Sequence, residues 1–85
     1  MSDKKGSLDN LINTLLQIKT RSEMLDFLKG ILTPLELEEI PTRLQIVKML
    51  KKGVSQHKIA EKLGIGVATV TRGSREIKLG RFKAV

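Results

Sequence analysis

The side chains best suited to chemistry in this 85-residue chain lie between Ser55 and Lys83. Small and hydroxyl side chains follow Gly66, and lysines and arginines surround them. Small side chains allow close approach to base edges, hydroxyls bond to bases or phosphates, and cations bind phosphates. The side chains that we expect to contact DNA are those of Ser55, Gln56, His57, Lys58, Val67, Ala68, Thr69, Thr71, Arg75 and Lys78.

The sequence offers little for catalysis or for metal binding. It has no cysteine, its one histidine is His57, and no acidic pair lies within an apolar stretch. We therefore expect neither an enzyme nor a metal site. Gly64 and Gly66 follow a predicted helix rather than a strand, which argues against a nucleotide-binding loop.

Charge is divided unevenly along the chain. Residues 1–40 carry five basic and seven acidic side chains, whereas residues 41–85 carry eleven basic and two acidic ones, a net charge of +9. This split is typical of a polyanion-binding region attached to a neutral scaffold, and a merely basic surface is the alternative. Aromatic platforms for single strands are scarce, since only Phe27 and Phe82 are aromatic. Duplex DNA is the favoured partner.

The spacing of the apolar residues in the N-terminal half predicts helices. After a disordered polar arm over residues 1–7, Ser7 is expected to cap a helix from Leu8 to Ile18, and Ser22 to start a second one ending near Leu32. Thr33, Pro34 and Glu36 have the spacing of a capping box that starts a third helix. We expect this helix to be short, because the residue before Pro41 avoids the α region.

A fourth helix is predicted from Pro41 to Lys52, with Gly53 just past its end. Its expected buried residues are Leu44, Ile46 or Val47, and Leu50. No segment alternates at a period of two residues. The fold class is therefore predicted to be all-α.

Residues 55–79 are predicted to form two helices joined by a tight turn. Ser55 caps a helix over Gln56–Leu63, and Gly64 ends it by taking a positive φ angle. The second helix begins after Gly66 and runs to about Leu79. The inward residues are Ile59, Ala60, Leu63, Ile65 and Val70. This is the pattern of a helix-turn-helix, whose second helix enters the major groove, although a plain helical corner has the same outline.

The chain as a whole predicts one small domain. A core of this size supplies little stability and no disulfide supports it, so we expect a homodimer. Residues 8–53 would form the dimerisation scaffold and residues 55–79 the DNA-binding unit. No apolar run is long enough for a membrane span, and the N-terminus lacks the pattern of a signal peptide. We expect a cytoplasmic, nucleoid-associated protein.

Several of these residues resemble the tryptophan repressor superfamily. The resemblance covers about residues 8–79, and Thr71-Arg72-Gly73-Ser74 is its most specific part. The other matching segments are Thr33-Pro34, Thr42-Arg43, Ser55-Gln56, Gly64 and Ala68–Val70. The resemblance implies an intertwined helical dimer that binds a pseudo-palindromic operator and represses transcription. It also implies L-tryptophan or a related corepressor at Thr33, Arg43, Arg72 and Gly73, where two guanidinium groups can hold a carboxylate.

The sequence departs from the family pattern at three points that affect the expected ligand, dimer and DNA contacts. Glu76 replaces a ligand-contacting serine, and its carboxylate could bind an amino group or pair with Arg43 or Arg72. The family's last dimer-forming helix has no counterpart before Val85, and Ala60 replaces a DNA-contacting lysine. We place the chain between tryptophan repressors and the related regulators whose ligands are undefined. The alternatives are a ligand-independent or architectural DNA-binding protein and a protein-interaction module with a basic surface.

Overall fold

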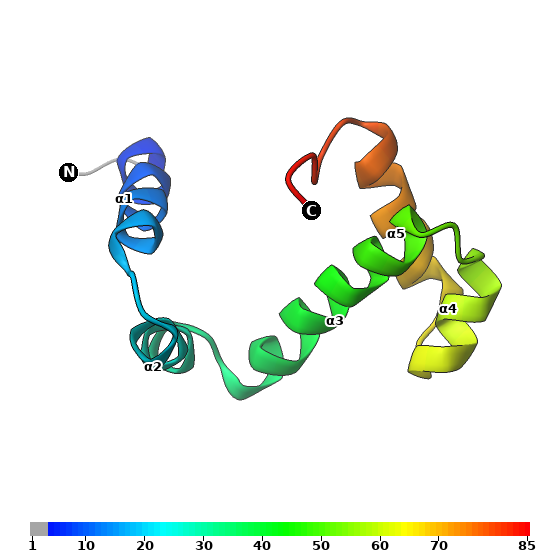
Figure 1. Ribbon diagram of the computed structural model, residues 1–85, viewed down its shortest axis with the longest axis horizontal. Coiled ribbons are helices and arrows are strands. Elements are labelled where there is room, and N and C mark those ends of the chain that lie inside the picture. The colour runs from blue at the N-terminus through cyan, green and yellow to red at the C-terminus, as the bar shows by residue number, and fades with distance from the viewer. Residues whose placement is uncertain (1–3) are drawn as a thin grey trace. The chain divides into compact units, whose positions relative to one another are not determined.

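The computed structural model describes residues 4–85, with side chains from Gly6 onward. In this part of the chain there are five helices and no strand (Figure 1). The helices are α1 Lys4–Gln17, α2 Arg21–Ile31, α3 Pro34–Lys51, α4 Gln56–Leu63 and α5 Val67–Lys78. The predicted all-α class is confirmed. One compact unit ends at Leu37 and the second covers Glu38–Val85. None of the described helices is both long and apolar enough to cross a membrane.

The two N-terminal helices begin earlier than predicted. Helix α1 starts at Lys4, so the expected disorder is wrong for residues 4–7, and Ser7 lies inside the helix; residues 1–3 lie outside the described residues. Helix α2 starts at Arg21 because Thr20 rather than Ser22 is its cap. The Thr20 hydroxyl accepts the Glu23 N–H at 3.1 Å, which satisfies a backbone donor of the first turn.

Helix α3 is continuous where we predicted two helices separated before Pro41. Its start is as expected: the Glu36 N–H donates to the Thr33 hydroxyl at 3.2 Å, and the Thr33 N–H donates to Glu36 Oε1 at 2.8 Å. Pro41 lies inside the helix and removes one backbone hydrogen bond. The helix nevertheless continues to Lys51, with Ile46 and Val47 buried in its C-terminal half.

The core of the second unit is formed where three helices meet. Ile46 of α3, Ile59 and Ala60 of α4 and Val70 of α5 are buried together. The partly buried residues around them are Met49, Leu50, Val54, Leu63 and Ile65. Both Ile46 and Val47 are buried, whereas Leu44, which we predicted to be buried, is 43% exposed. Leu44 precedes Ile46 by two positions in α3, which places it on nearly the opposite face of the helix, away from α4 and α5.

Turns at glycine set the direction of the chain after α4 and after α5. Gly64 has a φ of 66°, and the next residue, Ile65, donates its N–H to the Ala60 carbonyl at 3.0 Å. Gly80 has a φ of 97°, and Arg81 donates its N–H to the Glu76 carbonyl at 3.0 Å. Both are Schellman turns, in which a residue without a Cβ reverses the chain. We predicted the first turn and missed the second.

Candidate nucleic-acid interface and ligand pocket

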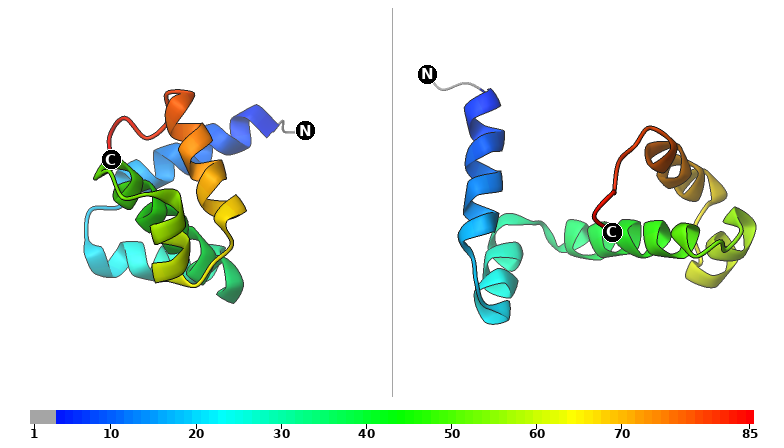
Figure 2. Two further views of the ribbon diagram at one scale, coloured as in Figure 1. Left: turned by 90° about the vertical axis from the view of Figure 1, so that its right-hand side faces the viewer. Right: turned by 45° about the horizontal axis from the view of Figure 1, so that its top comes forward.

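The exposed surface of the α4–α5 pair is fixed in place by its buried side. Ser55 caps α4 by accepting the Lys58 N–H at 3.2 Å, and α4 spans Gln56–Leu63 as predicted. Ile59 and Val70 are both fully buried. Because these residues hold α4 and α5 against α3, the opposite faces of the two helices are presented to solvent in a defined orientation (Figure 2).

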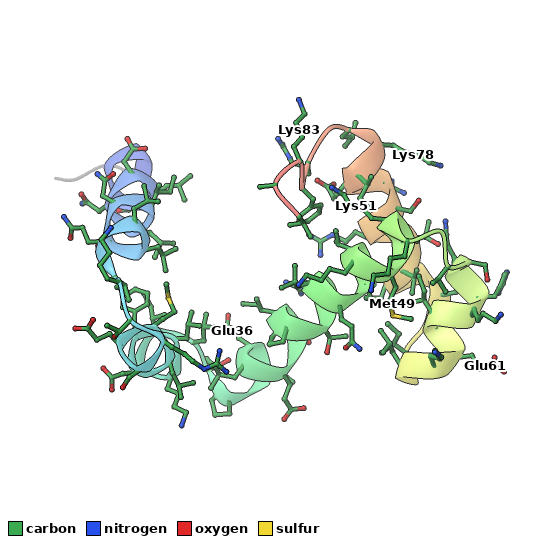
Figure 3. All side chains as sticks on the ribbon, in the orientation of Figure 1. Glu36, Met49, Lys51, Glu61, Lys78 and Lys83 are labelled. Atoms are coloured by element: carbon green, nitrogen blue, oxygen red, sulfur yellow. The ribbon has the colours of Figure 1, made fainter. Side chains whose placement is uncertain are left out.

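The side chains predicted to contact DNA all lie on this pair of helices. At the start of α5, Val67 is 40% exposed, and Ala68, Thr69 and Thr71 are exposed as well. At the start of α4, Gln56 is half-buried while Ser55, His57 and Lys58 are exposed. Arg75 and Lys78 are exposed further along α5, and Figure 3 shows Lys78 pointing away from the helices. The structure thus brings these residues onto two adjacent helices.

A hydrogen bond joins the two predicted contact regions. The Thr71 hydroxyl lies 2.7 Å from Gln56 Oε1 and 3.0 Å from the Val67 carbonyl oxygen, and it can donate to either. The bond to Gln56 engages that side chain's carbonyl oxygen. Its NH₂ group is left as a donor, which suits a phosphate oxygen or an acceptor on a base edge.

A pocket of about 320 Å³ lies beside α5, between that helix, α3 and the segment after α5. It is lined by Arg43, Ile46, Val47, Thr69, Arg72, Gly73, Glu76, Arg81 and Phe82. The structure therefore brings together Arg43, Arg72, Gly73 and Glu76, four of the five residues expected at a ligand site. Thr33 does not line this pocket; it caps α3, and its part in ligand binding stays a prediction.

Sequence reasoning missed the pocket wall that follows α5. Arg81 and Phe82 line the pocket, and Arg81 Nε lies 3.7 Å from Glu76 Oε1. Arg43 and Arg72 are the partners that the sequence suggests for Glu76, and neither forms an ion pair with it among the described residues. The glycine at position 80, directly after the helical pattern, was the available signal that the chain turns back here.

Gly73 allows the close approach of α5 to α3 beside the pocket. A Cβ atom added at this position would lie 3.2 Å from Cγ2 of Ile46 and 3.7 Å from Cδ1 of Leu50. Ile46 is fully buried and β-branched, so it has little room to move. The packing therefore favours glycine at this position, in agreement with the family resemblance.

Replacing Gly73 with valine should both destabilise the second unit and fill part of the pocket. Its branched side chain extends past the 3.2 Å contact, and overpacking of this kind costs about 1–3 kcal/mol. Urea unfolding measures the loss. Gly30→Val makes the same change in α2, where an added Cβ would meet nothing within 4 Å, and serves as the control for helix propensity. Equal losses for the two variants would show that the contact with Ile46 is unimportant.

Comparison with known proteins places these features in a family. The family model described as "Trp repressor protein" matches residues 6–83. Among curated relatives, "Trp operon repressor homolog" of Vibrio vulnificus (strain YJ016) is 50% identical over 50 residues, 58% of this chain and 49% of the relative. The protein of that name from Vibrio atlanticus (strain LGP32) is 40% identical over 72 residues, 84% of this chain and 70% of the relative. "Uncharacterized protein YerC" of Bacillus subtilis (strain 168) is 33% identical over 73 residues, 86% and 70% respectively.

The match to V. vulnificus spans about half the length of that relative, and the matches to V. atlanticus and YerC span more than two thirds. No solved structure matches this chain significantly. The family model covers both the α4–α5 pair and every residue that lines the pocket. The chain belongs to the Trp repressor protein family.

Proposed function

We propose that this chain is a transcriptional repressor that binds a pseudo-palindromic DNA operator as a homodimer. The observation that carries the proposal is the surface at the start of α5, where Val67, Ala68, Thr69 and Thr71 are exposed while Val70 between them is buried in the core. Side chains of this size allow a helix to approach base edges closely in the major groove. In this proposal α4 and α5 form a helix-turn-helix, with α5 as the reading helix.

The charge around this surface supports a DNA partner. Lys58 near the start of α4 is an exposed cation, and so are Arg75 and Lys78 on α5. The start of α4 also offers backbone N–H groups and the hydroxyl of Ser55, which suit phosphate oxygens. Each protomer of the dimer would bind the backbone beside one of two successive major grooves.

The apolar surface of the N-terminal unit supports a dimer. Helix α2 has no buried residue, and large apolar side chains are exposed along α1 and α2. These side chains are Leu8, Leu11, Ile12, Leu16, Leu25 and Ile31. Their helical spacing forms apolar stripes that a second copy of the chain would cover. Leu44 on α3 is also exposed, and a second copy of the chain would cover it as well.

The pocket supports an amino-acid corepressor such as L-tryptophan. Arg43 and Arg72 stand on separate helices, so their guanidinium groups can hold a carboxylate from two sides. Ile46 and Val47 give the pocket an apolar floor for a ring. Thr69 lines the pocket and is also a predicted DNA contact. A ligand in this pocket would therefore contact the proposed reading helix directly.

Selection of bound duplexes from a random pool, with and without L-tryptophan, tests the proposed function. We expect a two-fold symmetric site, which reports the dimer, and stronger selection when tryptophan is present. A variant with Thr69→Glu and Thr71→Glu places carboxylates against the phosphates and should select nothing. Binding of all duplexes with equal affinity would indicate an architectural protein. Unchanged binding to an acidic protein by this variant, with no DNA binding by the parent, would indicate an interaction module.

A further inference from the structure

The segment after α5 turns back and lies against α3. Gly80 reverses the chain, and the Lys51 ammonium group on α3 donates to the carbonyl oxygen of Phe82 and, at 3.1 Å, to that of Val85. Figure 3 shows Lys51 extending from α3 toward the segment that carries Lys83. We call residues 79–85 the tail.

The backbone of Phe82 is held in an unfavourable conformation. Its φ is 64°, and within residues 4–85 it is the one residue other than glycine with a positive φ. A residue with a bulky side chain rarely adopts this region, and it stays there only where surrounding contacts fix it. Here the Phe82 carbonyl accepts from Lys51 and, at 3.2 Å, from the Val85 N–H. These bonds place the aromatic ring at the pocket.

We propose that the tail is a wall of the pocket that determines ligand specificity. In this proposal Phe82 packs against the aromatic part of a ligand, and Arg81 pairs with Glu76 and so competes with the ligand for that carboxylate. The inference rests on the proposed function only in taking the pocket as a ligand site. Phe82 lines the pocket without filling it, because the pocket beside its side chain is open. It is also the one aromatic side chain that lines this pocket.

The charges around the pocket define the class of ligand. Three guanidinium groups and one carboxylate line it, and the carboxylate of Glu76 is paired with Arg81. Arg43 and Arg72 are then left to bind an anion, while no unpaired carboxylate of the pocket lining lies ready for an amino group. The lining therefore favours an aromatic carboxylate, and the pairing of Glu76 with Arg81 lowers what that carboxylate contributes to binding an amino group.

Calorimetry with two probes, L-tryptophan and indole-3-propionate, tests this inference on the full chain. The second probe has the same ring and a carboxylate without the amine, and we expect it to bind at least as tightly as the first. Phe82→Ala should weaken the binding of both probes about tenfold, because it removes an aromatic partner and apolar area. Phe82→Tyr keeps the ring and should restore the affinity.

Arg81→Ala tests the second role of the tail. It frees Glu76 to meet an amino group, so the ratio of affinities should shift toward L-tryptophan by about threefold, the size expected for an exposed ion pair. Arg81→Lys keeps the charge and should shift the ratio less. Lys83→Ala, which changes a neighbouring cation that does not line the pocket, should leave both affinities unchanged.

Two results would overturn the inference. One is unchanged affinity for both probes in Phe82→Ala and in Arg81→Ala. The other is the absence of heat with either probe in a parent protein that binds DNA, which leaves the proposed DNA-binding function intact. If the parent protein binds the probes with the expected dependence on Phe82 but binds no DNA, the role of the tail in ligand binding is supported. The proposed repressor function is then contradicted.

Discussion

Raising the salt concentration from about 50 to about 200 mM should lower the affinity of this chain for its duplex site by about 10³–10⁵-fold. The expectation follows from a dimer that neutralises about 6–10 phosphates, each of which releases a counterion on binding. The exposed cations Lys58, Arg75 and Lys78, on the α4–α5 pair of both protomers, would supply this charge. Fluorescence anisotropy with a labelled duplex, titrated at several salt concentrations, gives the slope of log affinity against log salt.

Single charge removals refine this measurement. Lys58→Gln and Lys78→Gln should each make the slope shallower by about 0.9 for every phosphate that is no longer neutralised, and therefore by about twice that in a dimer. Lys29→Gln removes the same charge from α2, where no DNA binding is proposed, and should leave the slope unchanged. If all three variants have the parent slope, the basic surface on the α4–α5 pair is not the DNA interface.

The α4–α5 pair could be predicted closely because its signals are local. Ser55 accepts a backbone N–H three residues away, and Gly64 takes the positive φ that its position after Leu63 requires. The spacing of Ile59 and Val70 indicated the inward faces, and both residues are fully buried. Each of these features depends on a few neighbouring residues, so a short stretch of sequence is enough to predict it.

Other features were missed because they depend on contacts that lie outside these short patterns. Pro41 has a local preference against helix, yet α3 continues through it, with a capping box at its start and buried residues only toward its end. Phe82 reaches the pocket through Lys51, which lies 31 residues earlier. Glu76 is paired with Arg81 across the turn at Gly80, which the spacing of charges within α5 did not suggest. The family resemblance predicted pocket residues on α3 and α5. It did not predict the wall formed by Arg81 and Phe82.

The second large effect is expected in the core, where Ile59→Ala should lower the free energy of unfolding by about 2–5 kcal/mol. Ile59 is fully buried between Ile46 of α3 and Val70 of α5, and truncation would leave a cavity where the three helices meet. A domain of this size is stabilised by about 5–15 kcal/mol in total, so the loss is a large fraction of its stability. Urea unfolding at fixed protein concentration measures it, because a dimer's midpoint depends on concentration.

Two matched variants separate packing from other effects. Ile59→Val removes one methylene and should cost about 0.5–1.5 kcal/mol, while Glu61→Ala, at an exposed site of the same helix, should change stability by less than about 0.5 kcal/mol. Ile59 lies neither in the pocket lining nor on the proposed DNA surface, yet DNA binding should fail at the temperature where Ile59→Ala unfolds. The small side chains of α5 can read base edges only while this core holds the helix in place. A loss of stability in Ile59→Ala no greater than that in Glu61→Ala would mean that α4 does not orient α5.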